Sequence, residues 1–238
     1  MRLLSYCAGI ETDIQFAYAS HVAYHTVMHI TVFGANGKVG RLVVKTALGH
    51  GHSVTAFVHS NSSFSHHPHL TIYRGDIHNP QSVSKAISGA DAVVSTLGSW
   101  HAPRKDILSS GMQTIIPAMQ QYGVRRIVSL TGADARMSGD EMSRWHRITH
   151  ACLFLFARKV LRDAEEHIRL LQASHLDWTV IRSPVMIEFG DPKKYFLDTL
   201  RPMPWHTIHR KSVVESIIME IEQPSASSTA PYICRAHH

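Results

Sequence analysis

Cysteine is scarce in this 238-residue sequence, which contains only Cys7, Cys152 and Cys234. An odd number of widely separated cysteines is not the pattern of a disulfide framework or of a Cys-based metal site. Long apolar runs are also missing, since no window approaches the ~20 consecutive apolar residues that span a membrane. We therefore expect a soluble, cytoplasmic protein with free thiols and no membrane association.

Charged residues make up only 18% of the chain, and no block of one sign stands out. Lysine and arginine number 24 against 18 aspartates and glutamates, which gives a formal net charge of +6. The basic pairs 125–126 and 193–194 are too short for a nucleic-acid-binding stripe. Hydrophobic residues reach 44%, enough for a core, and the length suits one domain. We expect no nucleic-acid partner, and the composition leaves the oligomeric state open.

Histidine is unusually frequent, with 19 residues spread along the chain. The densest group, His66, His67 and His69, lies beside serine-rich polar sequence. A metal site needs ligands that converge from fixed elements, usually with carboxylates or thiolates in support. We interpret this group as part of a surface loop and expect no metal site.

The first 27 residues differ in character from the rest of the chain. Glu11 and Asp13 interrupt the apolar run that a secretory signal requires. An apolar, β-branched run begins at Met28 and ends at Gly34, as a first strand would. We predict that residues 1–27 are an extension outside the fold. A real extra element that packs on the body is the alternative.

A glycine-rich turn follows this first strand, with Gly34, Gly37 and Gly40 in a Gly-x-x-Gly-x-x-Gly spacing. A helical pattern follows over residues 39–47. Glycine allows the tight turn and the close approach of backbone amides to a pyrophosphate, and the helix N-terminus favours the anion. Strand, turn and helix together predict dinucleotide binding; a purely structural turn is the alternative.

Strands and helices alternate along the rest of the chain. This alternation predicts an α/β fold, a Rossmann-type doubly wound parallel sheet whose ligands bind at the carboxyl ends of the strands. We expect strands at 53–58, 70–73, 91–95, 126–130, 176–183 and 231–234, and helices at 80–88, 107–121, 156–173 and 211–221.

The chain resembles the atypical short-chain dehydrogenase/reductases with an NAD(P)H-binding domain. This group contains the NmrA-like proteins and the flavin reductase/biliverdin-IXβ reductase family. The resemblance implies a Rossmann domain over 28–223, with substrate loops at about 133–150 and 185–210 in a small C-terminal lobe, and a strand and tail at 224–238. It rests on residues 30–40, 75–77, 89–94, 123–128 and 163–184.

The resemblance also implies contacts with each part of a bound nicotinamide nucleotide. The pyrophosphate would be held by Gly34, Asn36, Gly37, Lys38, Val39 and Gly40, and the adenine would lie beside Asp76 and Ile77. The nicotinamide ribose would be lined by Thr96, Leu97 and Gly98. The nicotinamide would lie near Ser129, Leu130 and Thr131, with Pro184 on its far side. For Thr96 and Ser129, plain packing at a strand end is the alternative.

The nucleotide is expected to be NADP(H). NAD-specific sites place Asp or Glu about 20 residues beyond the glycine motif. No carboxylate occurs in residues 58–62, so a 2′-phosphate would meet no repulsion. His59 stands where NADP-using relatives often have arginine, and Lys38 could add charge. If His59 is only an exposed loop residue, NAD(H) binds as well.

The tyrosine and lysine pair of classical short-chain dehydrogenases is missing, because no tyrosine has a lysine four residues later. Gly132 also stands where the flavin and biliverdin reductases have serine. Ser129 and Thr131 are the nearest hydroxyl candidates for catalysis. Hydride transfer to a planar acceptor depends chiefly on holding two rings in contact, so a reductase could work without a dedicated acid.

We therefore predict a reductase that transfers hydride to a flavin, quinone or similar planar acceptor. The alternative is a non-catalytic NmrA-like regulator that binds NAD(P) and a partner protein. An epimerase or dehydratase would also need the missing tyrosine. In the loops, His146 and Tyr195 are candidate substrate contacts and proton donors, although their aromatic neighbours could equally close the C-terminal lobe.

Overall fold

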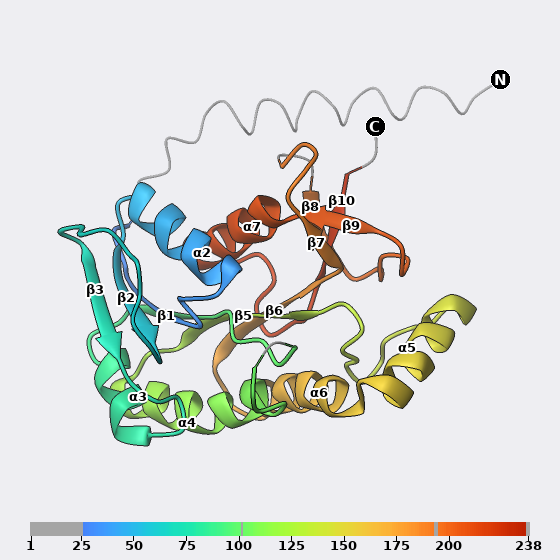
Figure 1. Ribbon diagram of the computed structural model, residues 1–238, viewed down its shortest axis with the longest axis horizontal. Helices are drawn as coiled ribbons and strands as arrows, with labels where there is room; N and C mark the ends of the chain where they lie inside the picture. Colours follow the sequence, from blue (N-terminus) through green and yellow to red (C-terminus); the bar gives the residue numbers. More distant parts are fainter. Residues whose placement is uncertain (1–25, 101, 193–194, 237–238) are drawn as a thin grey trace.

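The computed structural model describes residues 26–100, 102–192 and 195–236. The predicted extension 1–27 falls almost entirely outside the described residues. Within them, a large sheet has strand order β3-β2-β1-β4-β5-β6-β10-β8 (Figure 1). Its strands are β1 (His29–Phe33), β2 (Ser53–Val58), β3 (Leu70–Arg74), β4 (Ala92–Ser95), β5 (Arg126–Gly132), β6 (Asp177–Ser183), β8 (Tyr195–Asp198) and β10 (Tyr232–Arg235).

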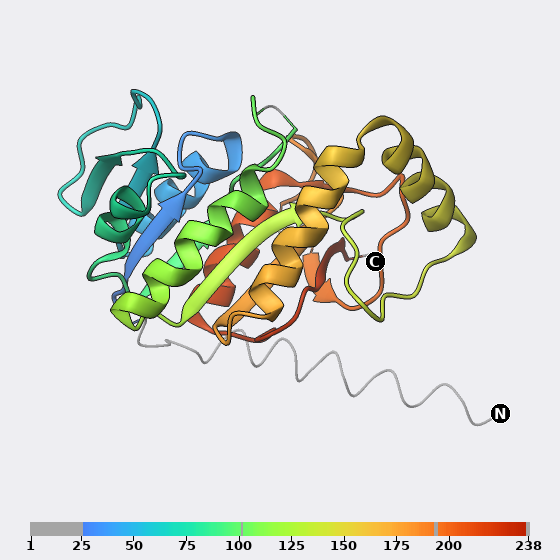
Figure 2. The same ribbon diagram turned by 90° about the horizontal axis from the view of Figure 1, so that it is seen from below.

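Helices cover both faces of this sheet, which confirms the predicted doubly wound α/β fold. α2 and α7 lie on one face, and α3, α4 and α6 lie on the other (Figures 1 and 2). α5 projects at the end of the molecule beyond α6 (Figure 2). The helices are α2 (Lys38–Gly49), α3 (Pro80–Ile87), α4 (Ile107–Tyr122), α5 (Arg144–Phe156), α6 (Arg158–Gln172) and α7 (Arg210–Glu222).

The central strands are apolar on both sides because both faces of the sheet are covered. In β1, Ile30 and Val32 belong to the core shared with α2 and α7. Phe33 belongs to the second core, which lies between the sheet and α3, α4 and α6. Alternate residues of one strand therefore enter different cores, as the pleat requires.

The C-terminal lobe departs from the sequence expectation. The predicted strand at 231–234 is β10, which lies between β6 and β8, parallel to β6 and antiparallel to β8. A small second sheet pairs β7 (Val185–Ile187) with β9 (Thr207–His209). These short strands lie within the region 185–210 that we expected as a substrate loop.

α5 is a further correction, because residues 133–149 were expected to form a loop. Ser143 caps the helix through its side chain, which accepts the His146 amide. The expected helix over 156–173 is in fact α6 alone, and Ala157 separates it from α5. His146 is the one buried residue of α5, whereas Ile148, Leu155 and Phe156 are largely exposed. None of the helices in the described parts of the chain is long and apolar enough to cross a membrane.

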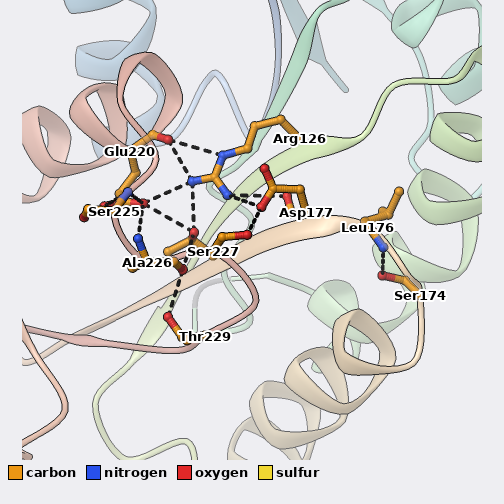
Figure 3. Close-up of polar contacts among 10 residues, drawn as sticks. Arg126, Ser174, Leu176, Asp177, Glu220, Ser225, Ala226, Ser227 and Thr229 are labelled. Carbon is orange, nitrogen blue, oxygen red and sulfur yellow. Dashed lines mark hydrogen bonds and ion pairs between the residues drawn. The ribbon is translucent and has the colours of Figure 1, made fainter.

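A buried ionic network closes the amino end of β5, opposite the end where ligands of such sheets bind (Figure 3). The Arg126 guanidinium donates to the Glu220 carbonyl at 2.7 Å and carboxylate at 3.1 Å, and to Thr179 Oγ1 at 2.9 Å. It also pairs with Asp177 at 3.0 Å. Glu220 is 2% exposed. We had interpreted Arg126 as part of a scattered basic pair; it instead joins β5, β6 and α7.

Candidate functional site

The predicted nucleotide-binding residues come together at one edge of the sheet. β1, β2, β3, β4 and β6 end immediately before Gly34, His59, Gly75, Thr96 and Pro184. Because these strands are parallel, their carboxyl ends share an edge. Ligands of doubly wound sheets bind at this edge.

The glycine turn brings strand, helix and Thr96 into close contact. Gly34 has φ +76°, and a Cβ there would lie 2.7 Å from the Thr96 carbonyl oxygen. A Cβ on Gly40 would lie 2.2 Å from the Gly34 carbonyl oxygen. The Thr96 hydroxyl donates to the Phe33 carbonyl at 3.0 Å. A side chain at either glycine would therefore force the turn open.

The amino end of α2 lies open to an anion. Gly37 is the N-cap, no side chain caps the helix, and the first turn has no acidic residue. A helix leaves its first amides without intrahelical partners, here those of Lys38 and Val39. Asn36 Oδ1 is buried without a hydrogen-bond partner, while Nδ2 donates to the Asn61 carbonyl at 3.3 Å. The free backbone amides fit a pyrophosphate, which accepts hydrogen bonds and is favoured by the helix dipole. Asn36 Oδ1 is itself an acceptor, so it does not bond the phosphate oxygens.

Two arginines that sequence reasoning missed hold the loop after β2. The Arg41 guanidinium donates to Ser63 Oγ at 2.6 Å, and Arg74 donates to Asn61 Oδ1 at 3.2 Å. His59 is exposed at the start of this loop. Each arginine adjoins a conspicuous glycine, Arg41 after Gly40 and Arg74 before Gly75, and that adjacency was the signal available in the sequence.

The residues predicted beside adenine and the nicotinamide ribose follow β3 and β4. Asp76 is exposed, and its carboxylate accepts the backbone amide two residues later at 2.9 Å. Ile77 is 8% exposed, and its carbonyl accepts the Thr114 hydroxyl at 2.8 Å. Leu97 is half-buried and Gly98 exposed. Their contacts with the nucleotide stay predictions.

Ser129 is bonded to a buried histidine. Its hydroxyl lies 2.7 Å from His167 Nε2, on α6, and both residues are at most 1% exposed. His167 Nδ1 has no hydrogen-bond partner among the described residues. The catalytic role of Ser129 stays a prediction, and the structure places its hydroxyl in the core beneath α6.

The nearby Asp163 carries a charge but is buried. It is 4% exposed, and its carboxylate accepts the backbone amides of Leu108 at 3.1 Å and Ser109 at 2.8 Å. It also accepts the hydroxyls of Ser99 at 2.7 Å and Ser109 at 2.6 Å. Asp163 therefore satisfies the amino end of α4 from α6 and fixes the segment after β4.

We expect His167 to make stability pH-dependent. Burial lowers the pKa of His167 to about 4, although the Asp163 charge opposes the shift. In the unfolded chain histidine titrates near about 6.5, so the unfolded state binds more protons between the two values. Stability should fall by roughly 3 kcal/mol as pH drops from about 6.5 to about 4.

Urea unfolding of the wild type and His167→Leu at pH 7 and pH 4.5 measures this effect. The variant should lose clearly less stability over that interval, whatever its stability at pH 7. His175→Asn, which changes an exposed histidine, should keep the wild-type dependence. Equal acid sensitivity of the wild type and His167→Leu would contradict a neutral buried His167.

Thr131 lies beside a second buried ion pair. It is opposite Arg182 of β6 in the sheet register. Arg182 binds both carboxylate oxygens of Asp140, and its guanidinium lies 3.7 Å from the Tyr232 ring centroid. Burial would raise the pKa of Asp140, but hydrogen bonds from Arg182 and the Met137 amide lower it overall. The loop after β5 is therefore anchored to β6 and β10.

Burial raises the pKa of Tyr232 to about 12, so its hydroxyl stays protonated.

The two predicted substrate contacts lie in different surroundings. His146 is 4% exposed; Nδ1 lies 3.1 Å from Ser143 Oγ, and Nε2 lies 3.0 Å from the Pro202 carbonyl. Both ring nitrogens thus contact protein atoms and join α5 to the C-terminal lobe. Tyr195 is half-buried on β8, and Pro184 separates β6 from β7. The substrate roles of His146 and Tyr195 stay predictions.

Two clefts open near this edge. The first, of about 480 Å³, lies between the loop after β5 and α5 and is lined by Arg136, Asp140, Met142, Arg147 and His150. Its volume falls in the range of small-molecule sites, about 300–1,000 Å³. The second, of about 580 Å³, is lined by Pro103, Arg104, Lys105, Asp106, Ser109, Lys159, Arg162, Asp163 and Glu166, where charges of both signs alternate. The described residues contain no group of three or more potential metal ligands.

The sheet order and the open glycine turn define a Rossmann-type dinucleotide-binding domain. The sequence profile of the NAD(P)H-binding family matches residues 34–224. The chain belongs to this NAD(P)H-binding family, which confirms the predicted resemblance.

Solved structures share the fold. An NADP complex of a wide-type short-chain dehydrogenase/reductase from Veillonella parvula has a TM-score of 0.68 and 20% identity, covering 87% of this chain and 94% of that one. ChuY, an anaerobillin reductase from Escherichia coli O157:H7, has a TM-score of 0.68 and 19% identity, covering 87% and 97%.

Curated relatives match over shorter stretches. The 2-alkyl-3-oxoalkanoate reductase of Stenotrophomonas maltophilia is 30% identical over 113 residues, 42% of this chain and 32% of that protein. The photosystem II assembly factor Ycf39 of Synechocystis is 29% identical over 106 residues, again 42% and 32%. The chain thus spans about a third of the length of these two relatives.

Proposed function

We propose that this protein is an NADPH-dependent reductase that transfers hydride to a flavin, quinone or similar planar acceptor. The observation that carries the proposal is the first cleft, which adjoins the carboxyl ends of β5 and β6 through Asp140 and its partner Arg182. That edge is where the nicotinamide contacts are predicted. Cys152 and Cys234, which form no disulfide within the described residues, support a cytoplasmic location as part of the same proposal.

The chain's own residues would bind and orient the reactants. The glycine turn and the amino end of α2 would hold the pyrophosphate. Bound NADPH supplies the hydride. Thr131 and Pro184 would position the nicotinamide, and the cleft would hold the acceptor. The proton for the reduced acceptor can come from water, because a reduced flavin or quinone is not a strongly basic alkoxide.

Acceptor-dependent oxidation of NADPH tests this proposal. Purified protein is given NADPH with FMN, and separately with a small quinone, and nicotinamide absorbance is followed. We expect turnover with at least one acceptor and none for Gly37→Glu, which obstructs the phosphate site. Tight nucleotide binding without any turnover would contradict the reductase and favour the regulator.

A regulator that binds NAD(P) and a partner protein is the second candidate. The observation that favours it is the exposed apolar surface of α5, where Ile148, Leu155 and Phe156 are 53%, 75% and 84% exposed. Exposed apolar patches of this kind often mark protein interaction sites. The turnover measurement separates the two candidates.

We expect the nucleotide preference to depend on the loop after β2. Arg41 and Arg74 hold this loop next to His59, and it carries no carboxylate. A 2′-phosphate there would gain charge-assisted hydrogen bonds, which NADH cannot form. The double variant Arg41→Gln/Arg74→Gln should weaken NADPH binding by about tenfold or more, while NADH changes much less. Titration of both nucleotides by fluorescence measures the ratio. Equal loss for both would mean that the arginines only shape the loop.

A further inference from the structure

We propose that the first cleft binds an oxyanion on the acceptor, so that the substrate is a planar anion and not a neutral ring. This inference rests on the proposed reductase function and specifies its substrate class. The shared chemistry is a phosphate or carboxylate group held by arginine, as in a phosphorylated flavin or a quinone that carries a carboxylate. The observation that supports it is that Arg136, from the loop after β5, and Arg147, from α5, line the same cleft.

The charges around the cleft are not balanced. Its one carboxylate, Asp140, is already bound on both oxygens by the buried Arg182, and it also accepts the Met137 amide at 2.8 Å. Arg182 is 2% exposed and has no other carboxylate partner among the described residues. The pair is therefore neutral as a unit, and Asp140 does not compensate other cations.

His150 is paired as well. Its Nε2 lies 3.1 Å from Glu165 Oε1. Arg136 and Arg147 are both exposed. Within 26–100, 102–192 and 195–236, neither forms an ion pair. Two guanidinium groups without an ion-pair partner therefore line one cleft, and Arg147 lies near the amino end of α5, where the helix dipole adds positive potential.

The cleft lies close enough to the reaction centre to hold one end of the acceptor. Arg182 stands opposite Thr131 in the register of β5 and β6, and its Nη1 donates to the Ala135 carbonyl at 3.3 Å. One ion pair thus separates the cleft wall from the strand that carries the predicted nicotinamide contact. An acceptor ring over that contact would place a flexible anionic substituent toward Arg136 and Arg147.

The loop that forms one wall is rigidly supported. Arg201, from the segment after β8, is bonded to Asp134 at 2.6 Å, and its side chain is 5% exposed. Together with the Arg182–Asp140 pair, this contact fixes the loop at both ends. A fixed wall favours binding because little conformational entropy is lost when the anion binds.

FMN and riboflavin test the inference, because they share one ring system and differ in the phosphate. With NADPH as donor, we expect the wild type to have a KM for FMN about tenfold below that for riboflavin. The variant Arg136→Gln/Arg147→Gln should raise the KM for FMN to the riboflavin value and leave riboflavin unchanged. Arg144→Gln, which removes an exposed arginine of α5 that does not line the cleft, is the matched control.

A second pair of acceptors distinguishes the source of the anion. A naphthoquinone with a carboxylate is compared with its unsubstituted parent in the wild type, the double variant and the Arg144→Gln control. Preference for FMN alone indicates a phosphate site, and preference for the carboxylated quinone alone indicates a carboxylate site. Preference for both indicates a general oxyanion site, and each of these results supports the inference.

Equilibrium binding keeps this test separate from the reductase proposal. Quenching of flavin fluorescence in the presence of NADP⁺ measures FMN and riboflavin binding without turnover. If nothing is reduced but FMN binds in a way that requires Arg136 and Arg147, the reductase proposal fails and the anion site stands. Equal binding and equal KM for charged and neutral acceptors, equal losses in the double variant and the control, or no binding at all would overturn the inference.

Discussion

Gly37→Glu should abolish nucleotide binding in a protein that remains folded. Gly37 is exposed, and its backbone at φ −68° and ψ 164° is open to any residue. The substitution therefore places a carboxylate at the amino end of α2, and the Cβ it adds requires only a small local shift. Repulsion of the pyrophosphate and obstruction of the amides should weaken NADPH binding by at least about 100-fold, or roughly 3 kcal/mol. Fluorescence titration with NADPH measures the loss.

Gly37→Ala is the matched control for this variant. A Cβ at Gly37 would lie 3.2 Å from the Gly34 carbonyl oxygen, a contact that a shift of a few tenths of an ångström relieves. Alanine should therefore lower the affinity far less than glutamate, with the same thermal midpoint for both variants. Unchanged binding by Gly37→Glu would show that the nucleotide does not use this turn.

Arg126→Met should cost the fold roughly 3 kcal/mol, because removing one partner of a buried ion pair leaves the other charge uncompensated. Arg126 is 8% exposed and Glu220 is 2% exposed, so solvent cannot replace the lost guanidinium. The serine and alanine contacts that remain on Glu220 satisfy its oxygens but do not neutralise it. Urea unfolding at pH 7 measures the change in the free energy of unfolding.

The adjacent Arg125 supplies the control for this prediction. It is exposed, and Arg125→Met should change stability by no more than about 0.5 kcal/mol. Because the network lies at the amino end of β5, Arg126→Met should keep its affinity for NADPH at temperatures where it is folded. Equal stability of the two variants would mean that solvent reaches Glu220 when Arg126 is absent.

Much of the nucleotide half of the fold could be predicted because its signals are local. The strand at 29–33, the three glycines and the helix after them follow one another directly in the sequence. Their geometry depends on short contacts such as that between Gly40 and Gly34. Alternating strands and helices then predict a parallel sheet, and right-handed crossovers limit the strand orders it can have.

The substrate half could not be predicted in the same way, because its structure depends on contacts between distant residues. In the sequence Arg182 is an ordinary strand residue, because its partners Asp140 and Tyr232 are far from it along the chain. The sequence likewise gives no sign that Arg126 is buried, because its partner Glu220 lies on α7, far along the chain. α5 has exposed apolar side chains, so it lacks the one-sided pattern by which a helix is recognised.

The position of β10 also determines the order in which the lobe can assemble. β8 has β10 as its neighbour in the large sheet, yet β8 comes earlier in the chain. Until β10 reaches β6, β8 has no strand to pair with, and Arg182 lacks the Tyr232 ring that covers it. Pairing of distant strands is slow because the entropy cost of closing the loop precedes the favourable contacts between the strands. The nucleotide-binding strands β1 to β4 can therefore associate first, and the C-terminal lobe completes last.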